Sequence, residues 1–103
     1  MELRHLRYFV AVAREGNFTR AAEILHIAQP PLSRQIQQLE DELGLVLIER
    51  GSRPLRLSEA GRLFYEQAVQ VLERIDEFRI RLNPIEPPWY VARMPGGVGG
   101  AAP

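Results

Sequence analysis

Apolar residues recur at helical spacing in the first part of the chain. The first such stripe advances by three or four positions at a time and consists of Leu3, Leu6, Val10 and Ala13. It predicts a helix with Gly16 as its C-terminal stop. Asn17 is suited to cap a second, short helix over 19–25, whose small alanines allow another helix to approach closely.

A third helix is expected after a three-residue turn over 26–28. Pro30 and Pro31 fit only the first turn of a helix, where their missing N–H groups need no partner, so this helix should begin at about Gln29 and end at Gly44. Its apolar face consists of Leu32, Ile36, Leu39 and Leu43. Its opposite face is polar and carries Ser33, Arg34, Gln37 and Gln38. One face therefore predicts a core contact and the other an exposed surface.

Residues 45–49 and 55–57 are short and apolar-rich, and the turn residues between them predict a two-stranded hairpin. Ser58 is a good N-cap for a long helix that runs to about Leu82. The apolar residues of this helix follow a heptad pattern and are Phe64, Ala68, Val71, Ile75, Phe78 and Leu82. Such a seam favours pairing with a second copy, since it would otherwise face water. For its first turns, packing against the first helix is expected even in a dimer.

These elements predict a mainly α fold: a winged helix-turn-helix of three helices and a two-stranded β-hairpin wing, followed by a long dimerisation helix. The expected parts are a helix-turn-helix domain over 1–57, a pairing helix over 58–82, and a tail over 83–103. The tail is rich in proline and glycine and has no apolar period, which is typical of a disordered or linker segment.

Composition limits the function classes. The chain has 103 residues, no cysteine and a formal net charge of zero. This size fits one domain and argues against a large enzyme, and the lack of cysteine excludes a disulfide framework. Uncharged apolar runs such as 44–48 are far too short to span a membrane, so a cytoplasmic protein is expected. His5 and His26 do not have metal-ligand spacing, and neither a metal nor a cofactor is expected.

Charge is concentrated locally. Between Arg50 and Arg62 there are four arginines and one acid, which gives a local charge of +3. The acidic run 40–42 at the end of the third helix is expected to be a solvated face, and its charge would repel phosphates. Only the N-terminal half of that helix should therefore enter a DNA major groove.

Candidate base readers follow from these two features. Glutamine can pair bidentately with adenine and arginine with guanine, while an arginine near a loop tip suits a narrow minor groove. The candidate DNA-binding residues are Gln29, Pro30, Pro31, Ser33, Arg34 and Gln37 on the third helix, and Arg50, Arg53 and Pro54 in the hairpin. The alternative for both groups is an ordinary solvated surface.

Several linked motifs over residues 1–82 resemble one protein family. They are Leu3-x-x-Leu6-x-x-Phe9, Phe18-Thr19-Arg20-Ala21-Ala22, Gln29-Pro30-x-Leu32-Ser33-Arg34-Gln35-Ile36, Leu39-Glu40-x-x-Leu43-Gly44, Arg53-Pro54 and Leu57-Ser58-x-Ala60-Gly61. Together they resemble the DNA-binding region of LysR-type transcriptional regulators, and the segments 1–12 and 28–34 resemble the subgroup that controls benzoate and catechol breakdown.

This resemblance implies a dimer on a dyad-symmetric, double-stranded DNA operator, with tetramers left open. It implies major-groove contacts from Gln29, Pro30, Ser33 and Arg34, and minor-groove contacts from the Arg53-Pro54 pair. Ala28 stands where many members have serine, which weakens side-chain capping of the third helix. The family continues into an inducer-binding domain after about Leu82, whereas this sequence does not, so no small-molecule effector site is expected in it. The alternative function is an interaction module that pairs with full-length relatives and disables them.

Overall fold

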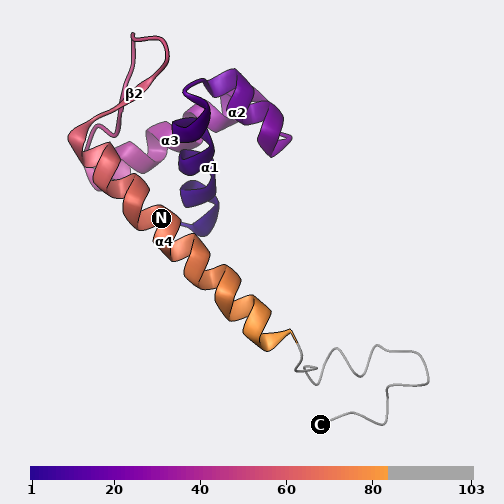
Figure 1. Ribbon diagram of the computed structural model, residues 1–103. Helices are drawn as coiled ribbons and strands as arrows, with labels where there is room; N and C mark the ends of the chain where they lie inside the picture. Colours follow the sequence, from indigo (N-terminus) through magenta and orange to yellow (C-terminus); the bar gives the residue numbers. More distant parts are fainter. Residues whose placement is uncertain (84–103) are drawn as a thin grey trace, which may run out of the picture. The chain divides into compact units, whose positions relative to one another are not determined.

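The computed structural model describes residues 1–83. Its elements, in order, are α1 (Leu3–Glu15), α2 (Phe18–Leu25), α3 (Gln29–Leu43), β1 (Ile48–Glu49), β2 (Arg56–Leu57) and α4 (Glu59–Leu82). Figure 1 shows the first three helices gathered around one another, with the hairpin extending from them. The mainly helical fold with a two-stranded hairpin is confirmed. The tail predicted over 83–103 lies, apart from Asn83, outside the described residues.

Residues 1–73 form a compact unit around one principal core. The fully buried side chains of this core come from α1, α3 and the start of the hairpin, and the largest are Phe9, Leu32, Ile36, Leu39, Leu47, Ile48 and Val12. On α2 the small residues Ala21 and Ala22 are buried, which lets α2 lie close to its neighbours. Burial of each large aliphatic side chain contributes about 1.5–3 kcal/mol. The predicted apolar face of α3 is therefore the surface that holds this helix in place.

The helix ends follow the capping residues in the sequence. Gly16 adopts φ 66° and ends α1, and the Asn17 side chain accepts a hydrogen bond from the Arg20 amide at the start of α2. His26 ends α2 with φ 60°, a left-handed conformation that histidine adopts more readily than most residues. Ala28 gives α3 no side-chain cap, as expected, and prolines occupy its first turn. Two tight turns thus orient α2 between α1 and α3.

The strands are shorter than the sequence predicted. Only Ile48 with Leu57 and Glu49 with Arg56 pair in the antiparallel ladder, instead of residues 45–49 with 55–57. The reason is that α3 takes the earlier backbone donors: the Leu45 amide bonds to the Glu40 carbonyl oxygen, and the amide of Leu47 bonds to the Glu40 side chain. Residues 44–47 are therefore a connection attached to α3.

The apolar seam of α4 divides into two parts. Ala68 is buried against Leu6 and Val10 of α1, and the Phe64 ring meets Phe9 edge-on with 5.1 Å between ring centroids. The first turns of α4 thus pack on α1, as expected. The later seam residues remain exposed or half-exposed and are Val71, Ile75, Phe78 and Leu82. Within residues 1–83, no helix has the length and apolar character that crossing a membrane requires.

The start of α4 lies directly against the connection before β1. The Ser58 hydroxyl accepts a hydrogen bond from the Gly61 amide, and the Ser58 amide donates to the carbonyl oxygen of Leu47 at 2.9 Å. A Cβ atom on Gly61 would overlap that same Leu47 carbonyl group. Glycine is therefore required here by the close approach of two backbones.

Gly61→Ala should destabilise the fold, although the same change inside an exposed helix stabilises by about 0.5–1 kcal/mol. The overlap with the Leu47 carbonyl should reverse the sign and lower the free energy of unfolding by about 1–3 kcal/mol, the usual range for overpacking. Urea unfolding followed by circular dichroism measures this. Gln70→Ala, at an exposed position of the same helix, is the control and should change stability by less than about 0.5 kcal/mol.

Candidate nucleic-acid interface

The polar face of α3 projects from the domain because its opposite face is fully buried. Leu32, Ile36 and Leu39 are each 0% exposed, so the side chains between them must point outward. Pro30, Arg34 and Gln37 are exposed, and Gln29, Pro31 and Ser33 are half-exposed. All six α3 candidates therefore lie on an accessible surface.

Two of these side chains, Gln37 and Arg34, differ in their internal contacts. The Gln37 amide donates to Asp41 Oδ1 at 3.0 Å, one turn along the helix. Arg34 has no hydrogen-bond or ion-pair partner among residues 1–83. An unpaired guanidinium beside the amino end of a helix is well placed to bind an acceptor from another molecule.

A groove lies between α2, α3 and the hairpin. Its lining brings together four of the predicted residues: Ser33, Arg50, Arg53 and Pro54. The other five do not line it and lie elsewhere on α3, before or after Ser33: Gln29, Pro30, Pro31, Arg34 and Gln37. The candidates thus form two adjoining surfaces, the exposed face of α3 and the groove beside it.

The groove also contains polar residues that sequence reasoning missed, namely Thr19 and Arg20 from the first turn of α2 and Ser52 from the hairpin turn. The Ser52 hydroxyl oxygen is buried and has no hydrogen-bond partner among the described residues. Asn17 was the sequence signal that could have found Thr19 and Arg20, because it marks the start of α2. A helix that starts beside a recognition helix presents its first N–H groups on the same side of the molecule as that helix.

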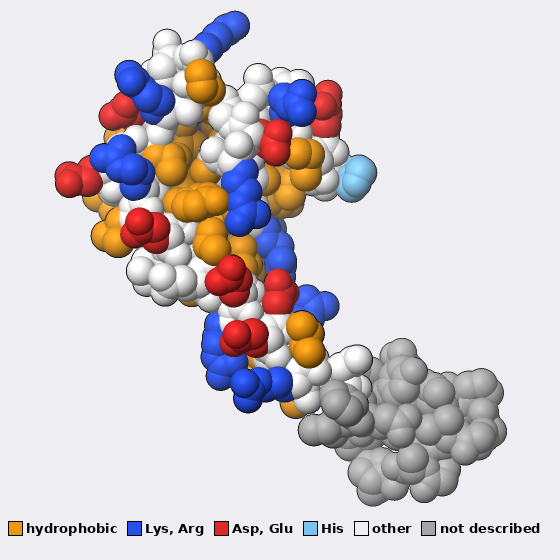
Figure 2. Space-filling view, viewed as in Figure 1, with side chains coloured by type: hydrophobic (Ala, Val, Ile, Leu, Met, Phe, Trp, Pro, Cys, Tyr) orange, Lys and Arg blue, Asp and Glu red, His pale blue; other side chains and the backbone are white. Residues whose placement is uncertain are grey.

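The hairpin turn is anchored at its base, while its basic tip is free. The Leu55 amide donates to the carbonyl oxygen of Gly16 at 3.0 Å, where α1 turns into α2. Arg53 is exposed and has no hydrogen-bond or ion-pair partner in the described part of the chain. Figure 2 shows basic side chains projecting from the hairpin, at the top of the view. The structure therefore leaves Arg53 available for an external anion.

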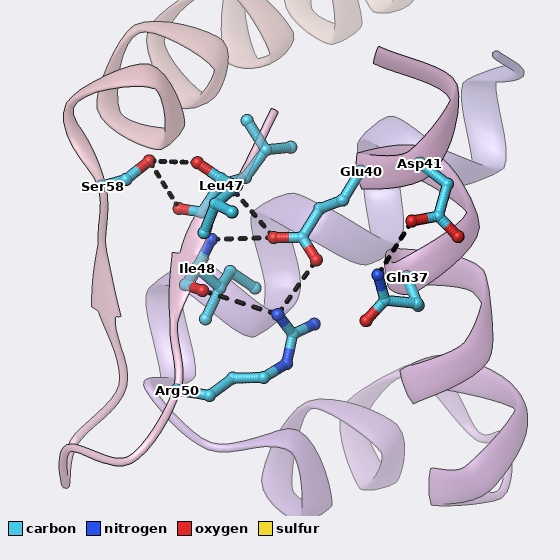
Figure 3. Close-up of polar contacts among 8 residues, drawn as sticks. Gln37, Glu40, Asp41, Leu47, Ile48, Arg50 and Ser58 are labelled. Atoms are coloured by element: carbon cyan, nitrogen blue, oxygen red, sulfur yellow. Dashed lines mark hydrogen bonds and ion pairs between the residues drawn. The ribbon is translucent and has the colours of Figure 1, made fainter. Parts of the chain in front are cut away.

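Arg50 lies in a different environment from Arg53. Its Nη1 atom donates to Glu40 Oε1 at 2.9 Å, and Glu40 is only 5% exposed (Figure 3). The prediction that residues 40–42 form a solvated acidic face is therefore wrong for Glu40. The physical reason is that Glu40 also accepts the Leu47 and Ile48 amides, which no strand partner satisfies.

Both ring nitrogens of His5 are engaged within the domain. Nδ1 accepts the Glu2 amide at 3.0 Å, so Nε2 carries the proton that is shared with Gln35 Oε1 at 2.8 Å. The ring thus closes the N-terminal cap of α1 and contacts α3. Across residues 1–83, no three His, Asp or Glu side chains are grouped as metal ligands would be.

Residues 3–62 match the family model described as "Bacterial regulatory helix-turn-helix protein, lysR family". The match covers more than half of the chain and spans α1 to the start of α4. The chain belongs to this family. The resemblance inferred from its sequence motifs is thereby confirmed.

Two curated relatives and one solved structure show how close the similarity is. The chain is 66% identical over 79 residues to a probable cat1 operon transcriptional activator of Acinetobacter lwoffii, and 71% identical over 73 residues to the regulator CatR of Pseudomonas putida. These alignments cover 77% and 71% of this chain. They cover only 26% and 25% of the relatives, so the chain spans about a quarter of their length.

The solved structure is the DNA-binding domain of BenM in complex with benA site 1 DNA. It has a TM-score of 0.81 and 56% sequence identity to this chain, and the match covers 82% of this chain and 96% of that one. The fold of this LysR-family chain is therefore that of a domain whose crystal contains DNA.

Gly16 and Gly44 give a matched pair that tests how the hairpin is anchored. They have nearly equal left-handed φ angles, 66° and 68°, so alanine should cost each about 1–2 kcal/mol in backbone strain. A Cβ on Gly16 would also lie 2.9 Å from the Pro54 Cβ, whereas one on Gly44 would contact nothing within 4 Å. Gly16→Ala should therefore lower the free energy of unfolding by about 1 kcal/mol more than Gly44→Ala.

Urea unfolding of the two variants side by side checks this. Equal losses would contradict the packing of Pro54 on the α1–α2 turn.

Proposed function

We propose that this chain binds double-stranded DNA with sequence specificity, as the DNA-reading part of a bacterial transcriptional regulator. The main support is the exposed face of α3 beside a groove that leads to Arg53, in a chain that shares its fold with a domain crystallised on DNA. Its target implies action in the cytoplasm, where bacterial DNA lies.

In this proposal the N-terminal half of α3 enters the major groove. Arg34 is the main base reader, because its free guanidinium can bind guanine O6 and N7 bidentately. Gln29 and Ser33 offer further polar contacts, and Pro30 and Pro31 offer apolar contact to thymine methyl groups. Gln37 lies nearer the acidic end of α3 and must give up its bond to Asp41 to read a base.

The hairpin would enter the neighbouring minor groove through Arg53 and Pro54. Between a major and a minor groove runs one sugar–phosphate strand, which must then cross the groove that α2, α3 and the hairpin enclose. The lining suits it: the first turn of α2 presents Thr19, and Arg20 can exchange its exposed contact with Glu15 for a phosphate. This geometry favours A·T-rich sequence under the hairpin, where the minor groove is narrow.

The pairing of two chains would use the later part of the α4 seam. Phe64 and Ala68 are covered by α1, so the proposed contact is carried by the residues that remain accessible: Val71, Ile75, Phe78 and Leu82. Residues 1–57 would then read DNA and residues 58–82 would set the spacing of two half-sites. A two-fold dimer predicts a dyad-symmetric operator.

Selection of bound duplexes from a random pool tests both parts of this proposal. The wild-type chain should recover a dyad-symmetric sequence, and Arg34→Ala should lose about 1–3 kcal/mol of binding free energy on it, with base preference relaxed at one position of each half-site. Gln38→Ala, on the same helix but outside the candidate set, is the control. Recovery of no preferred sequence would reject the function, and an equal loss on all sequences would make Arg34 a phosphate contact.

Phe78→Gln should shift the chain toward monomers, because it places a polar group in the exposed part of the seam. Phe78 is 55% exposed, so the change should leave the domain folded. Sedimentation equilibrium measures the association, and DNA titration should show weaker binding that no longer requires both half-sites. Gln70→Ala is the control on the same helix. An unchanged dimer would reject this seam as the pairing surface.

A further inference from the structure

Glu40 is the most enclosed charged residue in the described part of the chain. Its Oε2 atom accepts the amide of Leu47 at 2.7 Å and that of Ile48 at 3.1 Å, and its Oε1 atom accepts from Arg50 at 2.9 Å. Figure 3 shows the carboxylate pointing from α3 into the bend where the chain enters the hairpin. One side chain of α3 thus binds both the backbone and the Arg50 guanidinium at the base of the hairpin.

Arg50 completes this junction from the other side. Its guanidinium lies 5.7 Å from the ring centroid of Phe18, the first residue of α2, and Nη1 also reaches the Ile48 carbonyl oxygen at 3.5 Å. Arg50 therefore contacts α2 and α3 while belonging to the hairpin. Its side chain is 39% exposed, compared with 5% for its partner Glu40.

We propose that the Glu40–Arg50 pair positions the hairpin relative to α3, and that Arg50 acts in DNA binding by holding Arg53 in place and not by neutralising a phosphate. This inference rests on the proposed function and changes the role first assigned to Arg50. The charge of Arg50 is balanced by a buried carboxylate that has no other cation among residues 1–83. Opening the pair would leave that buried carboxylate with two amide donors but no counter-charge, which is costly, so the pair stays closed when DNA binds.

The salt dependence of binding distinguishes Arg53, whose charge is proposed to contact DNA, from Arg50, which is proposed to act through Arg53. Each phosphate that a cation neutralises adds about 0.9 to the slope of log Kobs against log salt concentration. Arg53→Gln should therefore reduce this slope. Arg50→Gln should weaken binding roughly tenfold and reduce the slope no more than Arg53→Gln does, and adding it to Arg53→Gln should reduce the slope no further, since Arg50 acts through the placement of Arg53. Arg50→Lys retains a charge for Glu40 and should recover most of the affinity.

Glu40→Gln gives the sharper test. If Arg50 were a phosphate contact held back by Glu40, removing the acidic charge would release it and strengthen binding. If the pair positions the hairpin, the same change should weaken specific binding roughly tenfold. Glu42→Gln removes one acidic charge from the same turn of α3, but Glu42 is exposed and, among residues 1–83, its one ion-pair partner is the terminal amine, so it serves as the matched control.

The experiment uses the full 103-residue chain, the benA site 1 duplex and a scrambled duplex of equal composition, with fluorescence anisotropy from low to high salt. A second measurement needs no DNA: hydrogen exchange by NMR at the Ile48 and Leu55 amides, which should become at least about tenfold faster in Arg50→Gln and stay protected in Arg53→Gln.

The outcomes can be told apart. Absence of wild-type binding to both duplexes counts against the proposed function, while the exchange rates still decide whether the pair orders the hairpin. A further reduction of the salt slope when Arg50→Gln is added to Arg53→Gln, tighter binding in Glu40→Gln, or unchanged exchange at both amides would overturn the inference.

Discussion

Leu47 joins the three parts of the domain whose fixed relation the proposed reading of two DNA grooves requires. Its amide donates to Glu40 of α3, its carbonyl oxygen accepts the Ser58 amide before α4, and its side chain is fully buried. Gly61 then brings the α4 backbone against the same residue. Because these contacts converge on one residue, α3, the hairpin and the first turns of α4 cannot shift independently within residues 1–73.

Much of the fold could be predicted because its signals are local. Gly16 and Asn17 ended one helix and began the next where the sequence placed them, and the two prolines after Gln29 located the start of α3. Such features depend on backbone conformation and on hydrogen bonds over three or four residues, which a sequence displays directly. The surface of α3 followed from the same periodicity, since burial of one face determines the other.

The Glu40–Arg50 junction could not be predicted in this way. A run of three acids at a helix end is normally solvated, and nothing in the run distinguishes Glu40 from its neighbours. Its burial depends on two amides seven and eight residues later whose strand partners are missing, which is a property of the assembled hairpin. The shortened strands and the internal ion pair of Arg50 have this same cause. The sequence predicted a basic hairpin in this region, but it could not distinguish Arg50, which pairs with Glu40, from Arg53, which has no partner among residues 1–83.

The zero net charge of the chain does not show which arginines are available to DNA, whereas their internal contacts do. Several arginines are occupied within the protein: Arg50 by Glu40, Arg14 by the Tyr65 hydroxyl group, and Arg20 by Glu15. Arg34 and Arg53 have no such partner among residues 1–83, and they lie on the two surfaces assigned to DNA. A neutral protein with a few free cations in fixed positions gains little from non-specific attraction to phosphate, so more of its affinity must come from base contacts.

The amino end of α3 has a further consequence. Ala28 contributes no capping oxygen, and the two prolines of the first turn contribute no N–H groups. That leading edge therefore holds few donors that need water. It can lose its water against a hydrocarbon surface, such as a row of thymine methyl groups, and few of its hydrogen-bond donors are then left without a partner. Where a serine-capped relative would keep a hydroxyl group at this edge, this chain is better suited to a dry contact.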